Sequence, residues 1–180
     1  MNIVRKFLEC LFVWNVSPTE IIEPDVILAH GVGDHEDGTP GPINQEMAVR
    51  IREFCSEHPG LSILAQGEVG QCLTGLKVQI VVPRQRDRAG KYIDTKDVAQ
   101  SQYAACKKGN WSRPVLFTWR PHVLRARQVT EKVFGIKVMI PDGLPKRYDK
   151  DNSQIWLRNP FVALPRELAA RMLYLFKGLI

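Results

Sequence analysis

The sequence lacks the features that would place it at once in a well-defined class of protein. Its 180 residues contain no run of five or more like charges, so no charged tail is present. The 4 cysteines include no C-x-x-C pair, which excludes a zinc knuckle and a thioredoxin-type motif and predicts reduced, buried thiols. A P-loop, a G-x-S-x-G elbow and a Ser-His-Asp order are missing too, so no motif names a reaction.

A long apolar run is also missing. Residues 7–16 are largely apolar, but Glu9 and Asn15 interrupt them, and they fall short of the roughly 20 residues of a membrane span. No A-x-A-like cleavage site follows, so the stretch differs from a signal peptide. We expect an amphipathic helix in an N-terminal helical extension of residues 1–20, packed on the sheet or on a second subunit. Membrane-surface association is the alternative. A cytoplasmic location follows from the preferred interpretation.

The composition is that of an ordinary globular protein. Hydrophobic residues make up 44% of the chain and charged residues 24%, so we expect a single domain over residues 1–180. The net charge of +6 favours an anionic partner. Because the cations are dispersed, with local concentrations at 84–88 and 113–127, an anionic small molecule is expected and nucleic acid is the alternative.

Short apolar runs alternate with apolar patterns of helical spacing. Strands are predicted at residues 25–29, 61–65, 78–82, 114–118 and 136–140, and helices at 43–55, 94–108, 121–134 and 165–176. This alternation predicts an α/β fold, a three-layer sandwich with a mainly parallel, Rossmann-like sheet of about five strands. Only residues 69–76 separate the turn after the second strand from the third strand. A parallel crossover normally needs more, so the third strand is expected to be displaced or to pair differently.

The segment 113–127 combines a buried strand, a tight turn and the start of a helix. Arg120, His122, Arg125 and Arg127 lie in and around the first two turns of this helix, where the helix dipole disfavours positive charge. A negatively charged ligand at the carboxyl end of the strand would explain the arrangement, and a solvated helix start is the alternative. Residues 122 and 125 are three apart, so they lie on one face of the helix.

Two motifs resemble those of a known family. The string Thr118-x-x-x-His122-x-x-Arg125-Ala126 resembles the T-x-x-x-H-x-x-R-A signature of the YdcF/SanA/ElyC-like domain family. The segment 94–99, Asp-Thr-Lys-Asp-Val-Ala, is similar to the N-T-x-E-N-A motif that precedes it in that family. The resemblance implies a Rossmann-like fold and a largely unassigned biochemical function, with at least one member described as binding S-adenosylmethionine. It therefore implies a nucleotide or S-adenosylmethionine as ligand or cofactor.

Glycines follow the first two predicted strands. Gly31 and Gly33 would let the backbone approach a ligand closely, although Glu36 replaces the last glycine of a G-x-G-x-x-G motif. Gly67 occupies the place of the glycine turn that the family carries after its second strand. The predicted ligand-binding residues are these glycines and the residues of the two motifs: Gly31, Gly33, Gly67, Asp94, Thr95, Asp97, Thr118, His122 and Arg125.

Three positions depart from the family pattern. Ala89 and Tyr92 stand where the family carries Glu and Ser, and Val98 replaces the asparagine of its motif. These changes leave open whether the family's ligand site is kept. Asp94 and Asp97 also fit a capping box, which would account for both carboxylates without a ligand.

Two loops carry further candidate groups. His30 and the acidic loop 34–37 combine imidazoles and carboxylates that would suit a divalent cation, but their spacing matches no metal-binding motif. A solvated acidic loop is the alternative, and no metal is included in the predicted site. In the loop that ends at residue 159, Tyr148 and Trp156 stand among cations. These rings would either stack on a base or cover the edge of the core.

Three classes of function follow. The first is binding of a nucleotide-like or S-adenosylmethionine-like anionic molecule. The second is a transferase or hydrolase for an anionic substrate, with His122 as general acid or base and Arg125 steadying the developing charge. The third is a basic nucleic-acid or protein-interaction module with a degenerate ligand site. Under the first two, Arg125→Ala is expected to abolish ligand binding with little loss of fold stability.

Overall fold

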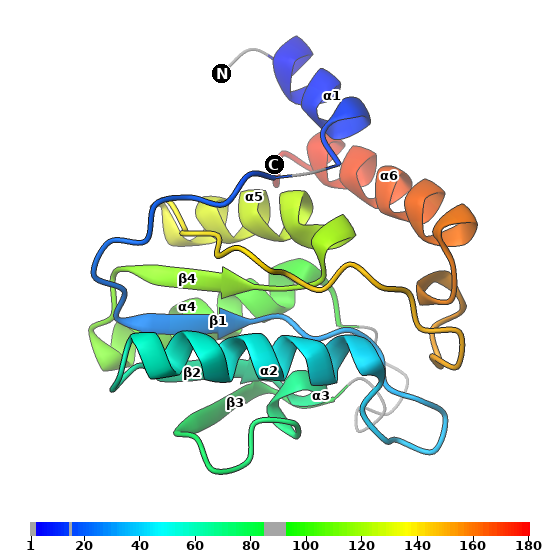
Figure 1. Ribbon diagram of the computed structural model, residues 1–180. Helices are drawn as coiled ribbons and strands as arrows, with labels where there is room; N and C mark the ends of the chain where they lie inside the picture. Colours follow the sequence, from blue (N-terminus) through cyan, green and yellow to red (C-terminus); the bar gives the residue numbers. More distant parts are fainter. Residues whose placement is uncertain (1–2, 15, 85–92) are drawn as a thin grey trace.

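The computed structural model describes residues 3–14, 16–84 and 93–180, which form layers of helices around a parallel sheet. The sheet has four strands, in the order β3-β2-β1-β4: β1 (Val26–Ala29), β2 (Ser62–Gln66), β3 (Val78–Val82) and β4 (Pro114–Phe117) (Figure 1). All neighbouring strands are parallel, so their carboxyl ends lie at one edge of the sheet. The predicted α/β sandwich with a parallel, Rossmann-like sheet is confirmed, with four strands instead of five.

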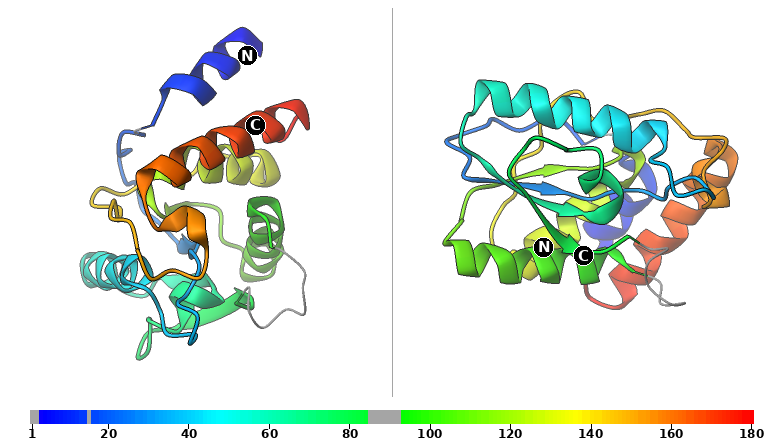
Figure 2. Two further views of the ribbon diagram at one scale, coloured as in Figure 1. Left: turned by 90° about the vertical axis from the view of Figure 1, so that its right-hand side faces the viewer. Right: turned by 90° about the horizontal axis from the view of Figure 1, so that it is seen from below.

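Helices cover both faces of the sheet (Figure 2). α2 (Pro42–Glu57) lies on one face, and α4 (Thr95–Gly109) and α5 (Val123–Phe134) lie on the other. Because both faces are covered, β1 and β4 are buried over their whole length, which explains why their sequences show no polar alternation.

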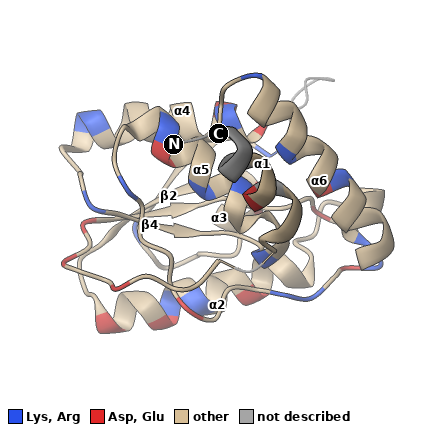
Figure 3. Ribbon diagram, turned by 90° about the horizontal axis from the view of Figure 1, so that it is seen from above, with Lys and Arg blue, Asp and Glu red and all other residues tan. Residues whose placement is uncertain are grey.

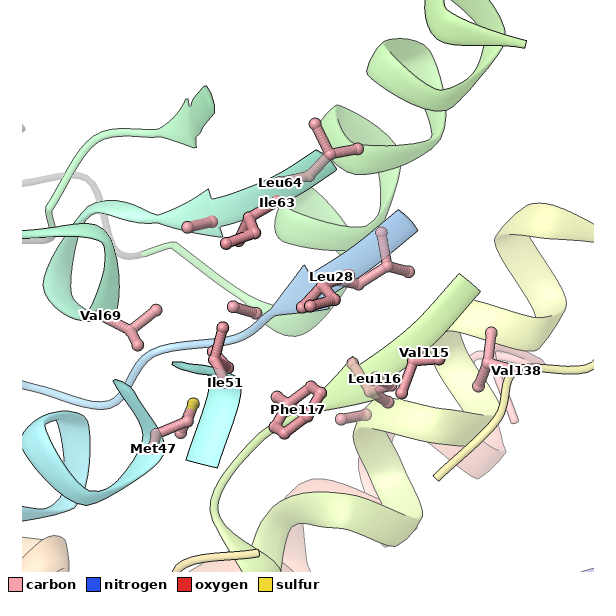
Figure 4. Close-up of a cluster of buried hydrophobic side chains, with 14 of the residues drawn as sticks. Leu28, Met47, Ile51, Ile63, Leu64, Val69, Val115, Leu116, Phe117 and Val138 are labelled. Atoms are coloured by element: carbon pink, nitrogen blue, oxygen red, sulfur yellow. The ribbon is translucent and has the colours of Figure 1, made fainter. Parts of the chain in front are cut away.

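The main hydrophobic core includes the layer between α2 and the sheet. Met47 and Ile51 of α2 lie against the strands in Figure 4, near Phe117 of β4, and both have no exposed surface. Burying a side chain of this size contributes about 1.5–3 kcal/mol. The apolar residues that predict α2 are thus the ones that it packs against the sheet.

The prediction of a fifth strand at residues 136–140 is wrong. Only Met139 pairs with the sheet there, through a single parallel bridge to Val115 of β4. The chain before Met139 turns back toward the end of α5, where Lys137 Nζ lies 3.0 Å from Glu131 Oε2. One bridged residue does not form a strand, so the sheet ends at β4.

The short connection before β3 is compatible with regular pairing. β3 pairs with β2 in parallel, with one register shift between Ala65 and Gln66. The connection contains the single helical turn α3 (Gly67–Gly70). A Cβ atom on Gly67 would lie only 2.6 Å from the amide nitrogen of Arg84, so glycine lets the turn pack closely on the chain after β3. The expected displacement or altered pairing of this strand is therefore not observed.

The predicted start of α4 is confirmed. Asp94 Oδ1 accepts a hydrogen bond from the Asp97 amide at 2.9 Å, and Asp97 Oδ2 accepts one from the Asp94 amide at 3.3 Å, which completes a capping box. The predicted order of strand, turn and helix over residues 113–127 is confirmed as well. The 3-10 turn η2 (Arg120–His122) links β4 to α5.

The last helix begins earlier than predicted. α6 (Pro160–Phe176) starts at Pro160, because Asn159 accepts a hydrogen bond from the Val162 amide at 3.1 Å and caps the helix. Pro165, the predicted start, lies inside the helix. The short turn η3 (Ile155–Leu157) precedes it.

The N-terminal extension is helical over only part of its length. α1 (Ile3–Phe12) lies beside α6 and projects from the rest of the chain (Figure 1). Residues 16–25 follow without helix, so the helical extension predicted for residues 1–20 is shorter than expected. None of the helices in the described parts of the chain combines the length and the apolar character that crossing a bilayer requires.

Candidate functional site

A cleft lies at the carboxyl ends of the strands. Its lining comes from the chain after β1, the last residue of β2, the start of α4, η2, the start of α5, and the segment from residue 154 into α6. In Figure 1 this last segment lies beyond the arrowheads of β1 and β4. The cleft holds about 720 Å³ of space free of protein atoms, open solvent at its mouth included.

Most of the predicted ligand-binding residues meet in this cleft. The lining includes Gly31, Gly33, Asp94, Thr95, His122 and Arg125. Parallel pairing explains this convergence, because it brings the ends of β1 and β4 to the same edge of the sheet. The motifs at residues 94–99 and 118–126 are thus neighbours in space.

The other three predicted residues do not line the cleft. Gly67 borders a separate hollow beside Arg84. Thr118 is wholly buried at the end of β4, and its hydroxyl makes no hydrogen bond within the described chain. Asp97 completes the cap of α4. The roles that the structure shows for Gly67 and Asp97 are structural.

Arg125 is held by a carboxylate that the sequence did not single out. Glu167 of α6 accepts hydrogen bonds from Arg125 Nη2 at 2.8 Å and from Arg125 Nε at 3.0 Å, and both residues are buried. Burial alone would raise the pKa of Glu167, but the charges of Arg125 and His122 and their hydrogen bonds lower it to about 2. Glu167 is therefore ionised at neutral pH. The cations of residues 113–127 predict a negative charge beside them, and Glu167 supplies part of that charge.

This ion pair changes the outcome expected for Arg125→Ala. Removing one partner of a buried ion pair costs about 3–5 kcal/mol when the other charge is left alone, and Arg171, 3.3 Å from Glu167, would offset part of that cost here. Because Arg125 and Glu167 are both almost fully buried, we now expect Arg125→Ala to destabilise the fold strongly. Other cleft residues are better suited to a test of ligand binding.

His122 lies between Glu167 and Thr95. Its Nδ1 is 3.4 Å from Glu167 Oε2, and its Nε2 is 3.5 Å from Thr95 Oγ1. Burial, followed by the charge of Arg125, lowers the pKa of His122 below its ordinary value of 6.5. The imidazole is therefore neutral at pH 7. An ionised carboxylate only accepts hydrogen bonds, so Nδ1 carries the proton and Nε2 keeps its lone pair.

Arg171 extends this network to the N-terminal segment. It has no exposed surface, and its Nε lies 3.3 Å from Glu167 Oε1. Its Nη1 and Nη2 donate to the backbone oxygens of Val13 and Pro121 at 2.8 and 2.9 Å. The indole of Trp14 lies 4.4 Å from the guanidinium carbon. A single side chain of α6 thus joins the cleft to η2 and to the chain that follows α1.

His30 forms a neutral part of the cleft wall. Its Nε2 lies 2.7 Å from Gln102 Oε1, and Gln102 Nε2 donates to the Leu64 carbonyl at 3.0 Å. This orientation makes Nε2 of His30 the donor. Burial and the charge of His122 lower the pKa of His30 to about 3, although its bond to Gln102 acts in the opposite direction.

The acidic loop is engaged by neighbouring protein groups. Asp34 is buried and accepts hydrogen bonds from Gln71 Nε2 at 3.1 Å and from Asn44 Nδ2 at 3.4 Å. His35 Nε2 lies 3.2 Å from Asp149 Oδ2. In the part of the chain that the structure describes, no three His, Cys, Asp or Glu side chains are grouped so as to hold a metal ion.

Aromatic side chains also line the cleft. The Arg166 guanidinium lies 3.5 Å from the ring centre of Trp156, and both residues line the cleft. Trp119 also lines it, with its Nε1 bonded to the Arg147 carbonyl at 2.9 Å and its ring edge-on to Tyr148. Trp156 packs against the same apolar cluster as Tyr148, so core covering describes both rings. Trp156 also lines the cleft, with Arg166 over one face of its ring.

The positions that depart from the family pattern contribute no polar group that the structure describes. Ala89 and Tyr92 lie outside the described residues. Val98 is buried with Val82 and Ile93 and lines the cleft. An apolar surface therefore stands where the family motif has an asparagine.

Sequence reasoning missed Glu167, Arg171 and Gln102. Each is a polar residue on the buried face of a helix, α4 for Gln102 and α6 for the other two. The sequence predicts α4 from its capping residues and α6 from apolar spacing. For Glu167 and Arg171, the available signal was an acid and a base four residues apart on one helix. For Gln102, it was a polar residue between Val98 and Ala105 on the buried face of α4.

Comparison of the chain with protein-family models, with curated proteins and with solved structures finds no match. The resemblance to the YdcF/SanA/ElyC-like family therefore rests on the two motifs alone. The function has to be argued from the cleft.

Proposed function

We propose that the protein binds a small molecule with an anionic group in the cleft at the carboxyl ends of β1 and β4. The observation that carries this proposal is the convergence of Thr95, His122, Arg125 and Arg166 from separate elements on one hollow. Open parallel sheets bind ligands at this edge. The proposal keeps the anionic ligand that the cations of residues 113–127 predict.

The field inside the cleft supports an anionic group. The charge of Arg125 helps to lower the pKa values of both His30 and His122, while Glu167 acts in the opposite direction on His122. Arg166 adds a second cation on the wall. An anion between these arginines would be attracted from two sides.

The apolar wall supports a flat or hydrophobic part in the same ligand. Trp156 and Leu157 of η3 face the cleft together with Ile93. A ring stacked on an indole gains about 1–3 kcal/mol. A nucleotide-like or S-adenosylmethionine-like molecule combines both parts, and the motif resemblance points to the same class.

The nucleic-acid alternative has less support in the charge distribution. Lys and Arg positions are interspersed with Asp and Glu positions over the elements visible in Figure 3. A protein that follows a phosphate backbone would present a continuous cationic track. The enzymatic alternative is favoured by the contacts of His122 with Thr95 and Glu167.

The test is thermal unfolding with ATP, S-adenosylmethionine or inorganic phosphate at constant ionic strength. A ligand that binds the cleft raises the unfolding temperature in proportion to the logarithm of its concentration once that exceeds the dissociation constant. Arg166→Ala is expected to weaken binding about tenfold, or about 1.4 kcal/mol. Arg50→Ala is the matched control, because Arg50 is half exposed on α2, pairs with Glu53 and lies outside the cleft.

Two results would count against the proposal. One is the absence of stabilisation by all three ligands. The other is equal stabilisation of wild type and Arg166→Ala, which would place any binding elsewhere. Salt-dependent binding to arbitrary DNA or RNA, without small-molecule stabilisation, would favour the nucleic-acid alternative.

A further inference from the structure

Four side chains in the cleft form a closed ring of polar contacts. Arg125 Nη1 donates to Thr95 Oγ1 at 2.7 Å, and Arg125 also donates to Glu167 through Nε and Nη2. Glu167 Oε2 lies 3.4 Å from His122 Nδ1, and His122 Nε2 lies 3.5 Å from Thr95 Oγ1. Thr95, Arg125 and Glu167 are buried, and all four residues line the cleft.

The chemistry of the groups fixes the direction of every contact. A guanidinium only donates hydrogen bonds and an ionised carboxylate only accepts them. Glu167 therefore accepts a hydrogen bond from His122 Nδ1, which keeps its proton. The lone pair of Nε2 then faces Thr95. Because the Thr95 oxygen already accepts from Arg125, its own proton is available to Nε2. A hydroxyl, a neutral imidazole and a carboxylate thus stand in the order that activates a nucleophile.

We propose that Thr95, His122 and Glu167 form a nucleophilic relay that hydrolyses a carboxylic ester, with Thr95 Oγ as the attacking atom. His122 is the general base, and Glu167 is a positioning residue that holds the imidazole in the required tautomer. The inference rests on one part of the proposed function, that the cleft admits a small molecule. No single sequence motif carries it, since residues 95, 122 and 167 lie on three different helical elements.

A neutral acyl carbon suits this site better than a phosphoryl group. The Arg125 guanidinium lies 2.7 Å from the Thr95 oxygen, and the Glu167 carboxylate lies 3.4 Å from the His122 ring. The charges around the attack position therefore largely offset each other. An ester carbonyl is uncharged before attack. The positive charge of Arg125, which already touches the Thr95 oxygen, favours the negative charge that develops on that oxygen as it loses its proton.

The reaction balances without a further reagent. Thr95 Oγ forms a bond to the carbonyl carbon while its proton passes to His122 Nε2, and the Glu167 carboxylate stabilises the imidazolium. The bond from carbon to the leaving oxygen then breaks, and that oxygen takes the proton from Nε2. In the second half, Nε2 removes a proton from water, the water oxygen attacks the acyl carbon, and Thr95 regains its proton as the acyl–Oγ bond breaks.

The experiment uses the full chain with p-nitrophenyl acetate, an activated ester small enough to need no specific recognition. We expect a burst of about one p-nitrophenolate per protein and an acetyl group on Thr95 in peptide mass spectra. Thr95→Val should slow the burst by at least about 100-fold, whereas Thr95→Ser keeps the hydroxyl and should stay within about tenfold of wild type. Thr130→Val is the matched control, because Thr130 is wholly buried on α5 and lies outside the cleft.

The role of Glu167 is tested by the pH profile. In wild type the burst rate should rise with pH to a plateau, with the midpoint of the rise below pH 6.5, because burial lowers the pKa of His122. The charge and hydrogen bond of Glu167 raise that pKa, so Glu167→Gln should move the rise to lower pH and also reduce the plateau. A purely structural role for Glu167 would leave the position of the rise unchanged.

Three outcomes would overturn the relay: no burst in wild type, an equal burst in Thr95→Val, or acetylation confined to lysines. Any of them, together with ATP or S-adenosylmethionine stabilising wild type, would leave the binding proposal standing. An acetyl group on Thr95 without stabilisation by ATP, S-adenosylmethionine or phosphate would support the relay and contradict the anionic ligand.

Discussion

Helices α2 and α6 are similar in length and differ in what they bury. α2 buries an apolar stripe that includes Ile43, Met47 and Ile51, as its sequence predicts. α6 buries Ala163, Glu167, Arg171, Tyr174 and Leu175. The apolar stripe that its sequence predicts is Leu164, Leu168, Met172, Leu175 and Phe176. Of these five only Leu175 is buried, and Phe176 is exposed. The face of α6 toward the cleft is thus more polar than the face its sequence predicts.

The difference shows what each helix contributes. An apolar face next to the sheet contributes stability through burial alone. A buried face that carries charges has to be matched by specific partners, because unpaired charges are costly away from water. α6 finds these partners in Arg125, His122 and Thr95, which are the residues that the sequence motifs place at the cleft.

The largest expected effect is that of Glu167→Ala. The substitution leaves the guanidinium groups of Arg125 and Arg171 without their shared carboxylate, so we expect a loss of about 3–5 kcal/mol in the free energy of unfolding. Urea denaturation at pH 7 measures it. A loss below about 1 kcal/mol would show that the network does not hold α6 in place.

A smaller effect is expected on the apolar side. Ile51→Ala in α2 removes a side chain with no exposed surface and should cost about 3 kcal/mol through lost burial and the cavity left behind. The same urea experiment applies. Unlike Glu167→Ala, this variant should bind ligand as wild type does, since Ile51 lies outside the cleft. Loss of ligand binding in Ile51→Ala would remove the distinction between the two helices.

These two helices also show how much could be predicted. The parallel sheet, α2 and the capped start of α4 follow from local apolar spacing and capping residues, which act over a few neighbouring positions. The convergence of Thr95, His122 and Arg125 follows from two motifs at the ends of parallel strands. Glu167 could not be assigned to the cleft this way, because its partners Arg125 and His122 are 42 and 45 residues away in the sequence.

The wrong prediction of a strand at residues 136–140 also comes from contacts between distant segments. Residues 136–140 have the apolar composition of a strand, but Lys137 and Val138 contact Glu131 of α5, and Met139 alone reaches the sheet. Such contacts between elements are invisible to a pattern that considers one segment at a time.

α6 and α2 should also differ in how their contributions to stability depend on pH. The folded pKa of Glu167 is about 2 against an ordinary value of 4.5, so its contribution is complete above pH 4.5 and is lost as the pH falls toward 2. This pH-dependent contribution of Glu167 to the free energy of unfolding is on the order of 3 kcal/mol. The stability difference between wild type and Glu167→Gln should therefore shrink from pH 7 to pH 3, whereas that between wild type and Ile51→Ala should stay constant. A constant difference in both would contradict an ionised Glu167.

The smallest effect is expected when the whole network is made apolar. The combined variant Arg125→Met, Glu167→Leu and Arg171→Met removes three buried charges together, so its stability should lie within about 1 kcal/mol of wild type or above it. Its ligand binding should be lost. If this variant still binds ATP or S-adenosylmethionine as wild type does, the charged face of α6 has no role in the cleft.

The most direct test of the cleft is an NMR titration of the histidine side chains. The chain has 4 histidines, of which His30 and His122 line the cleft and His35 and His58 do not. At pH 7 we predict that His122 is neutral with its proton on Nδ1, and that its resonances and those of His30 shift when S-adenosylmethionine or ATP binds, while those of His35 and His58 stay in place. An imidazolium at residue 122, or unchanged His30 and His122 resonances at saturating ligand, would contradict the account.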